Sequence, residues 1–372
     1  MSAKKKILLV GDMPGWAFDN IISFIKEQLK KEYDFYYDFT VYNPRKSSTG
    51  LSDSTGTTDT SLIDDHFRKM YFRSSIPLIN SLSYKIVSYL NKWGILERDA
   101  EGKKRRIRVD NTYDCVVFLD FYMDIDGDFD HLTARRVVKG IYTDGYPPKG
   151  IKLEAQSIES FLKNYYHNAA ALLAGSKSIS EIYRPHTKLD IYTANMAYDE
   201  LIFKPRNKSS KRVDNKLILG WTGNPNRSFK GFHEIILPVV NELQKEGLNI
   251  ELRTQFSGTL NSLADFWQEI DLAIIMSEAD AGPSLFMEAS LCGVPSISTN
   301  IGMPTEVIIN DFNGKLIERN SEALKIAIKN IYFEPNILNL WRQNIRGAYI
   351  NKLGCQVQKN NWKNLFNGIL NE

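Results

Sequence analysis

The stretch Asp280–Pro295, DAGPSLFMEASLCGVP, lies between two short apolar runs, Leu272–Met276 and Pro295–Ser298. Apolar runs of this length are typical of buried strands, and the pattern of Ser284–Leu291 between them predicts a helix. Strand, helix and strand in this order predict a parallel sheet whose strands are connected by helices. The stretch therefore places the second half of the chain in the α/β class.

The same alternation extends toward the middle of the chain. We expect strands at Leu217–Trp221 and Ile250–Arg253, and a helix at Phe232–Leu243 with one apolar stripe at helical spacing. The segment just before them, residues 204–215 (KPRNKSSKRVDN), is polar and rich in residues that break regular structure. Its composition predicts a linker between two domains.

The first half repeats the pattern less cleanly. Between residues 47 and 61, 12 of 15 residues are Ser, Thr or Gly, and this composition predicts a loop. The expected strands are Lys6–Val10, Phe35–Val41, Cys115–Leu119, Val137–Tyr142, Ala169–Gly175 and Leu189–Thr193, and the expected helices are Phe18–Leu29 and Ile79–Leu96. We therefore expect an α/β protein with two doubly wound Rossmann-like domains facing a cleft, with ligands at the carboxyl ends of the strands.

Composition limits the other possibilities. Of 372 residues, 43% are hydrophobic and 24% are charged, values that are typical of a globular protein. No apolar run approaches the 18 residues of a transmembrane helix, and Ile7–Val10 is too short for a signal peptide. Cys115, Cys292 and Cys355 lie far apart, which argues against a disulfide framework or a zinc ribbon. These features predict a cytoplasmic protein and leave open whether it is peripheral to a membrane.

Two acids in the opening stretch suggest a nucleotide site. Asp280 and Glu288 stand eight residues apart, separated by a turn that contains Gly282 and Pro283. Pro283 suits a first helical turn and Ser284 a cap, and free N–H groups at such a helix start attract phosphate. A carboxylate one turn further along can accept hydrogen bonds from two ribose hydroxyls. The alternative is an ordinary strand, loop and helix with Glu288 on the surface.

A second motif, Gly220–Gly231, reads GWTGNPNRSFKG. Arg227 and Lys230 follow a strand and a turn rich in Gly and Asn, and they precede a helix. Two cations at this place can bind a diphosphate and stabilise the charge that a nucleoside diphosphate develops as a leaving group. The alternative is a solvated basic loop.

The two motifs in this order resemble the family 4 glycosyltransferases, which have the GT-B fold. That family carries the pattern E-G-F-G-x-x-x-x-E-A-M-A-x-G-x-P, and Asp280 stands where its first Glu is usual. The positions that match outright are Glu288, Ala289, Gly293 and Pro295. The Arg and Lys with which the family binds phosphate are similar to Arg227 and Lys230. The resemblance is strong in the second domain.

Weaker similarity extends over the rest of the chain. It includes Ala170–Ile182, a segment Asn195–Pro205 in which Met196 replaces a usual Gly, and positions around Glu306 and Trp362. The resemblance implies an N-terminal acceptor-side domain at residues 1–205 and a nucleotide-sugar domain at 206–345. A C-terminal helix within 346–372 then packs back on the first domain.

The resemblance also implies an activity: metal-independent sugar transfer, with retention of anomeric configuration, from a nucleoside-diphosphate sugar to a hydroxyl. Arg227 and Lys230 would hold the diphosphate, Asp280 the donor sugar and Glu288 the ribose. No cofactor is expected, and the donor is expected to be a UDP- or GDP-linked sugar. Backbone groups near the donor would come from Gly15, Gly282, Pro283, Ser284 and Leu285.

On the acceptor side the sequence leaves choices open. Trp16 either stacks on an acceptor sugar or is an exposed helix end. Asp144 stands near the place where many members of the family carry His, and it either takes a polar role or stabilises its loop. The acceptor is open: a glycan, a lipid-linked glycan, a protein or modified DNA.

Other features have competing interpretations. The basic run Lys103–Arg108 either contacts an anionic surface or polyanion weakly or is a solvated loop. The acidic run Asp124–Asp130 resembles a metal motif, but Arg135 stands where an EF-hand needs Glu, so a solvated acidic loop is favoured. Asp280 in place of Glu, the missing His and the altered Asn195–Pro205 segment allow a non-catalytic nucleotide-sugar-binding module. A sugar-nucleotide epimerase is a further alternative.

Overall fold

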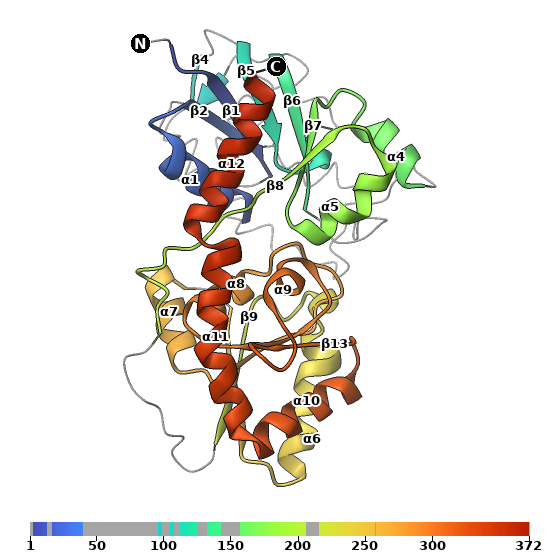
Figure 1. The fold of residues 1–372 in the computed structure, drawn as a ribbon, viewed down its shortest axis with the longest axis vertical. Coiled ribbons are helices and arrows are strands. Elements are labelled where there is room, and N and C mark those ends of the chain that lie inside the picture. The colour runs from blue at the N-terminus through green and yellow to red at the C-terminus, as the bar shows by residue number, and fades with distance from the viewer. Residues whose placement is uncertain are drawn as a thin grey trace, which may run out of the picture.

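The computed structural model describes residues 3–12, 17–39, 96–98, 105–107, 112–124, 132–142, 157–205, 216–256 and 258–371. Each half of the chain builds one parallel sheet with helices packed on it, and the two resulting lobes lie end to end (Figure 1). The predicted architecture of two Rossmann-like domains is confirmed.

The first sheet has six parallel strands in the order β2-β1-β5-β6-β7-β8. The strands are β1 Lys6–Gly11, β2 Asp34–Phe39, β5 Thr112–Phe118, β6 Thr133–Ile141, β7 Ala171–Ala174 and β8 Asp190–Thr193. The strand order reverses direction between β1 and β5. In doubly wound sheets a crevice for ligands opens at such a point, outside the carboxyl ends of the strands.

Helices follow the strands of this sheet. The apolar side chains of α1, among them Ile21, Ile22 and Ile25, recur at helical spacing and are buried. The helices are α1 Ala17–Leu29, α4 Ile158–Tyr165 and α5 Lys177–Tyr183, with short 3₁₀ turns at Phe121–Asp124 and Arg184–His186. Ser157 and Ser176 cap α4 and α5 through their side-chain oxygens, which fixes where these two helices begin.

Part of the basic run is a strand, which corrects the interpretation of the run as a loop. β3 Leu96–Arg98 pairs antiparallel with β4 Arg105–Ile107, and β3 contacts β2 of the first sheet. The expected helix Ile79–Leu96 lies outside the described residues, except that Leu96 begins β3. The expected loop at residues 47–61 also lies outside the described residues.

The second sheet has five parallel strands in the order β10-β9-β11-β12-β13, and its strand order reverses between β9 and β11. The strands are β9 Leu217–Thr222, β10 Ile250–Gln255, β11 Leu272–Ile275, β12 Ser296–Thr299 and β13 Lys315–Ile317. The helices are α6 Leu237–Lys245, α7 Leu260–Gln268, α8 Ser284–Leu291, α9 Gly302–Val307 and α10 Ser321–Phe333. Helix α8 has the bounds that its sequence predicted.

The expected helix Phe232–Leu243 is present as one continuous helical segment, but its first turn is π-helical rather than α-helical, which corrects part of the prediction. A π-helical turn, Phe232–Ile236, comes before α6, and the Ile236 N–H donates to the Gly231 carbonyl five residues earlier at 3.0 Å. Pro238 has no N–H to donate to the Glu234 carbonyl, and its ring crowds that carbonyl in a regular helix. The wider turn relieves the crowding.

Two long helices close the chain and run along both lobes (Figure 1). Helix α11 Pro335–Leu353 packs on α8, α9 and α10, whereas α12 Cys355–Leu370 contacts α1, β5 and β8 of the first domain. Trp362 of α12 is fully buried and donates from Nε1 to the Asn195 carbonyl at 2.8 Å. The predicted return of a C-terminal helix to the first domain is confirmed. The expected division between residues 345 and 346 falls inside α11.

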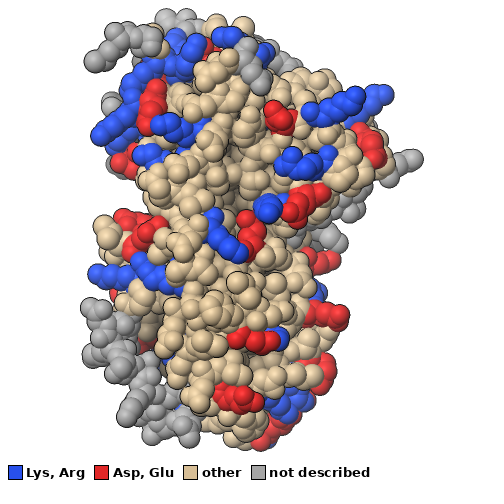
Figure 2. All heavy atoms as spheres, viewed as in Figure 1, with Lys and Arg blue, Asp and Glu red and all other residues tan. Residues whose placement is uncertain are grey.

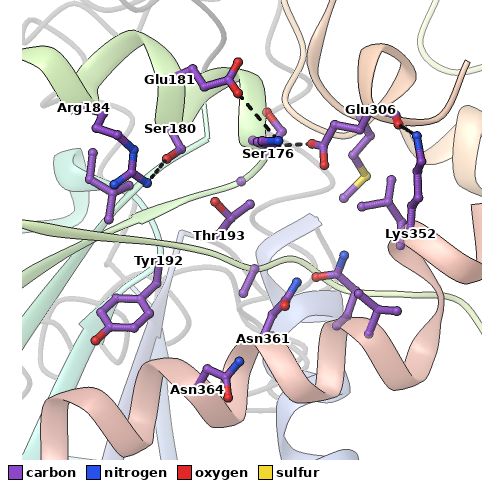
Figure 3. A pocket seen from close by; sticks show the side chains of 18 residues that line it. Ser176, Ser180, Glu181, Arg184, Tyr192, Thr193, Glu306, Lys352, Asn361 and Asn364 are labelled. Atoms are coloured by element: carbon purple, nitrogen blue, oxygen red, sulfur yellow. Dashed lines mark hydrogen bonds and ion pairs between the residues drawn. The ribbon is translucent and has the colours of Figure 1, made fainter.

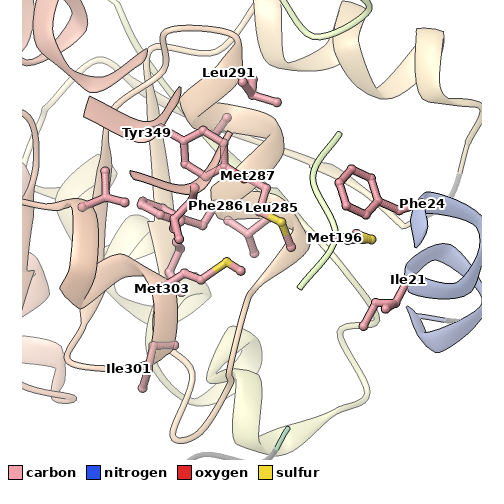
Figure 4. Packing of buried hydrophobic residues seen from close by; sticks show 14 of the residues in the cluster. Ile21, Phe24, Met196, Leu285, Phe286, Met287, Leu291, Ile301, Met303 and Tyr349 are labelled. Carbon is pink, nitrogen blue, oxygen red and sulfur yellow. The ribbon is translucent and has the colours of Figure 1, made fainter. Parts of the chain in front are cut away.

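One hydrophobic core continues from the first domain into the second. Met196, on the segment that crosses between the sheets, is buried at their junction. Figure 4 shows it between Ile21 and Phe24 of α1 on one side and Leu285 of α8 on the other. The Met that replaces a usual Gly therefore fills apolar space between the domains.

The outer face carries charges of both signs over both lobes, which are separated by a narrower waist (Figure 2). Within the ranges given above, no helix is long and apolar enough to cross a membrane. Cys115, Cys292 and Cys355 all belong to the described part of the chain and are free.

Candidate active site at the carboxyl ends of the strands

The loop after β9 carries the two predicted cations. Arg227 precedes a 3₁₀ turn, Ser228–Lys230, and Gly231 ends that turn with φ +71°. A Cβ at Gly231 would lie 2.6 Å from the Met276 carbonyl oxygen at the end of β11. Gly231 thus allows both a left-handed backbone and a close approach of the two strand ends. The loop that follows β9 is thereby held against the loop that follows β11.

Lys230 and Asp280 form an ion pair between the loops that follow β9 and β11. The Lys230 ammonium forms an ion pair with Asp280 Oδ2, and the two side chains are 18% and 17% exposed. The other carboxylate oxygen, Oδ1, accepts the N–H of Gly282 at 3.2 Å. The structure therefore brings together two residues that the sequence separates by fifty positions, and it uses Asp280 to fix the turn that leads into α8.

The start of α8 differs in detail from the sequence prediction. Pro283 is the N-cap residue and Ser284 the first helical residue, and Ser284 does not cap the helix with its side chain. Because α8 begins here, the N–H groups of Ser284 and Leu285 precede the first helical hydrogen bond. That first bond runs from the Phe286 N–H to the Pro283 carbonyl at 2.9 Å. Two of the expected backbone donors, Ser284 and Leu285, therefore lie at this helix start beside Asp280. The other two in this stretch differ from the expectation, because the Gly282 N–H donates to Asp280 Oδ1 and Pro283 has no N–H.

Glu288 is not on the surface, so the surface alternative is wrong. It is 3% exposed, and Oε2 accepts the indole N–H of Trp267 at 2.8 Å. Burial raises the pKa of Glu288, although hydrogen bonds from Trp267, Tyr198 and Thr222 act to lower it. The carboxylate sits one turn inside α8, as predicted, but its three polar neighbours were not predicted.

The first domain presents a second polar cluster, which sequence reasoning missed. Asp12 follows β1 and Asp120 follows β5, on the two sides of the point where the sheet reverses. Burial raises the pKa of Asp120 to about 8, with a further increase from the Asp12 charge, against hydrogen bonds from the Phe121 and Tyr142 N–H groups. The position of both acids directly after apolar strands was the signal that could have identified them.

The loops at the strand ends of the two domains approach each other. A Cβ at Gly175, after β7, would lie 3.0 Å from Ala281 Cβ, after β11. Burial raises the pKa of Tyr122, and the charges of Asp12 and Asp120 raise it further, whereas Arg227 from the second domain lowers it. A single phenol therefore senses acids of one domain and a cation of the other. The carboxyl ends of the two sheets face a common cleft.

Direct contacts also join the domains near α8. The Lys177 N–H at the start of α5 donates to Glu306 Oε1 of α9 at 2.8 Å. The buried Asn195 side chain lies at the same boundary: it donates to the Gly175 carbonyl of its own domain at 2.9 Å, and a Cβ at Gly282 of the second domain would lie 3.0 Å from Asn195 Nδ2. A pocket of about 490 Å³ opens beside these contacts, between α5 and β8 on one side and α9 and α12 on the other (Figure 3).

Several predicted residues lie outside the described ranges. They are Gly15, Trp16 and Asp144, the ends of the basic run at 103–104 and 108, and residues 125–130 of the acidic run. Asp124, the described member of that acidic run, forms an ion pair with the buried Lys139 at 2.7 Å. No cluster of three or more His, Cys, Asp or Glu side chains arranged to hold a metal ion occurs among the residues with described positions.

Comparison with known sequences relates the second domain to glycosyl transferases. Residues 239–348 match the family described as "Glycosyl transferases group 1". Over 73 residues the chain is 36% identical to N-acetyl-alpha-D-glucosaminyl L-malate synthase of Bacillus anthracis. That match covers 20% of this chain and 19% of the relative.

Solved structures extend the similarity to both domains. The chain aligns with HepE of Anabaena, solved in complex with UDP and glucose, at a TM-score of 0.61 and 14% identity, covering 97% of this chain and 99% of HepE. It aligns with sucrose-phosphate synthase of Thermosynechococcus elongatus at a TM-score of 0.63 and 13% identity, covering 99% and 100%. The chain has the GT-B fold. At these identities the likeness establishes the architecture alone.

Proposed function

We propose that this protein is a glycosyltransferase that moves a sugar from a nucleoside-diphosphate donor to a hydroxyl of an acceptor. The observation that carries the proposal is the cluster at the carboxyl ends of β9 and β11. There, Lys230 pairs with Asp280 beside the start of α8, and Glu288 lies one turn further along. The match of residues 239–348 to group 1 glycosyl transferases supports it independently.

Each part of the cluster has a chemical task in this proposal. Arg227 and Lys230 bind the diphosphate and stabilise the negative charge that develops on the departing β-phosphate. The N–H groups of Ser284 and Leu285 add donors at the helix start. Glu288 accepts from the ribose, and Asp280 contacts the donor sugar once the diphosphate competes for Lys230.

We further propose that the reaction retains the anomeric configuration and needs no metal ion. The similarity of Asp280–Pro295 to the family 4 pattern supports retention. Fixed cations beside a helix start are able to neutralise the leaving group. UDP or GDP is the expected leaving nucleotide, and the UDP bound in the solved HepE structures favours UDP.

The acceptor binds, in this proposal, against the strand ends of the first domain. Asp12 and Asp120 lie there, and carboxyl groups are suited to bind hydroxyls of a polyol or glycan. A polyanionic acceptor such as modified DNA is the variant suggested by the Lys103–Arg108 run. We place the protein in the cytoplasm, where a reducing environment keeps Cys115, Cys292 and Cys355 as the free thiols observed.

The test is thermal unfolding with UDP, GDP, ADP, CDP and TDP. A diphosphate at one hundred times its dissociation constant stabilises by about 2.7 kcal/mol. We expect one diphosphate to stabilise the wild type and not Glu288→Ala, while Glu322→Ala on an exposed position of α10 responds as wild type. If no diphosphate stabilises the wild type, the donor site is refuted.

Transfer is then measured with sugar derivatives of the diphosphate that binds. Release of nucleoside diphosphate that requires an acceptor supports the transferase. Binding without turnover of any donor instead indicates a non-catalytic sugar-nucleotide module. A changed sugar nucleotide formed from the donor alone indicates an epimerase.

A further inference from the structure

Trp267 and Glu288 form a buried pair between two helices of the second domain. The indole N–H donates to Glu288 Oε2 at 2.8 Å, the Trp267 side chain is fully buried and Glu288 is 3% exposed. Trp267 lies on α7, and α7 packs against α8, which carries Glu288. The pair therefore links a helix outside the donor loops to the carboxylate proposed to bind ribose.

The indole is held rigidly. A Cβ at Gly220 of β9 would lie 3.0 Å from Trp267 Cζ3 and 2.6 Å from Ile270 Cγ2, so the glycine leaves room for the ring. Phe266 packs edge-on against the indole at 5.1 Å between ring centroids. Gly220 of β9 leaves space for the indole, and Phe266 packs against it. Trp267 therefore holds its N–H in one direction.

The Trp267 indole and the Glu288 carboxylate have fixed roles in their hydrogen bond. An indole N–H only donates, so Trp267 keeps this hydrogen bond only while Glu288 Oε2 points toward it and accepts. The other polar neighbours of the carboxylate, the Tyr198 and Thr222 hydroxyls, can donate or accept and can rotate. A bound ribose hydroxyl can replace such an adaptable partner more easily than it can replace the indole.

We propose that Trp267 is a positioning residue that fixes Glu288 through Oε2 and so directs Oε1 toward the hydroxyls of the donor ribose. The inference rests on the proposed function, because it requires a ribose at Glu288. It assigns selectivity for ribose to a tryptophan that is fully buried in the protein. Nothing in the local sequence of α7 indicates this role.

The test compares UDP with 2′,3′-dideoxy-UDP, which carries the same base and phosphates but neither ribose hydroxyl. We measure the dissociation constants of both for wild type and for Trp267→Phe. We expect the preference of the wild type for UDP to fall at least fivefold in Trp267→Phe, with little change in affinity for the dideoxy compound. An indole needed only for folding would weaken both ligands equally, and that result overturns the inference.

Trp362→Phe is the matched control. Trp362 is also fully buried and also donates from Nε1 at 2.8 Å, but to the Asn195 carbonyl. Its loss is expected to lower the stability and leave the preference for UDP unchanged. An equal fall in preference in both variants overturns the inference.

A second replacement covers the case in which Trp267→Phe does not fold. β-(3-Benzothienyl)alanine at position 267 keeps the bicyclic shape and replaces only the N–H by sulfur. We expect the same loss of preference, and an unchanged preference overturns the inference. If the wild type binds none of the five nucleoside diphosphates, the proposed function itself fails, which is a different result from binding with an unchanged preference.

Discussion

The strand order reverses at an equivalent place in each sheet, between β1 and β5 in the first and between β9 and β11 in the second. We call these places the first and the second reversal point, and they carry opposite charges. The first carries Asp12 and Asp120, and burial, with a smaller increase from the Asp12 charge, raises the pKa of Asp120. The second carries Arg227 and Lys230, and Asp280 there has a cation as its partner. One fold element thus supports an acidic face and a cationic face across a single cleft.

The difference shows where an anionic ligand belongs. A diphosphate placed at the first reversal point would meet two carboxyl groups, whereas at the second reversal point it meets two cations and a helix start. The two domains also differ in the groups that hold their buried carboxyl groups. Asp120 is held by backbone N–H groups, and Glu288 by the side chains Trp267, Tyr198 and Thr222.

The largest effect is expected for Lys230, which lies where the strand order of the second sheet reverses. Lys230→Ala should lower the rate of sugar transfer about 100- to 1000-fold, because the charge on the leaving phosphate loses a fixed partner. Steady-state transfer assays measure it. Lys325→Ala is the control, since Lys325 is equally buried at 17% exposure and is also ion-paired, but lies on α10 away from the cleft. Equal losses of transfer rate in both variants would contradict a specific role for the cations of the second domain in the cleft.

The next effect tests how the cationic loop is held. Gly231→Ala places a side chain at φ +71° and within 2.6 Å of the Met276 carbonyl, so we expect a loss of about 3 kcal/mol in unfolding free energy. Gly247→Ala, at φ +90° with nothing within 4 Å, should lose only about 1 kcal/mol. Urea unfolding compares the two. Similar losses would show that the approach to β11 is not under steric constraint.

The first reversal point is tested by pH. The pKa of Asp120 in the folded protein, about 8, lies above that of the unfolded chain, so its contribution to stability is full below the ordinary range of Asp and is lost as pH rises toward 8. Stability of the wild type should therefore fall, relative to Asp120→Asn, by about 1 kcal/mol per pH unit between pH 5 and 8. Parallel pH profiles in urea unfolding would contradict a buried, protonated Asp120.

The smallest effect concerns the second buried carboxyl. Since burial raises the pKa of Glu288, its ionised form costs stability as pH rises through that pKa. Glu288→Gln should raise the unfolding free energy at alkaline pH, where the buried charge costs most, and weaken the stabilisation by UDP. Thermal unfolding with and without UDP separates the two effects. A variant that is less stable without ligand would show that the carboxylate is needed for folding.

Much of the fold was predictable from local pattern. The bounds of α8 and the positions of β9, β11 and β12 follow from apolar runs of strand length that alternate with a helical segment. The spacing of Asp280 and Glu288, and the cations of the Gly220–Gly231 motif, were also visible in the sequence. These signals are local, because each depends on residues within one strand, helix or turn.

The errors arose where one local rule competed with another. Apolar spacing predicted a regular helix at Phe232–Leu243, but Pro238 imposes a π-helical turn before α6. Clustered charge suggested a loop at the basic run, but Arg105–Ile107 pairs with Leu96–Arg98 as a strand. In both cases a backbone hydrogen-bonding requirement outweighed the side-chain pattern.

The sequence by itself determined that two α/β halves exist and which short segments carry acids and cations, because periodicity and turn residues are properties of neighbours in the chain. Only the tertiary structure decided which of these groups meet. The pairing of Lys230 with Asp280, the bond from Trp267 to Glu288 and the bond from Lys177 to Glu306 join residues from 21 to 129 positions apart. Such contacts depend on the order of strands in the sheets and on the placement of the two domains, which no local pattern encodes.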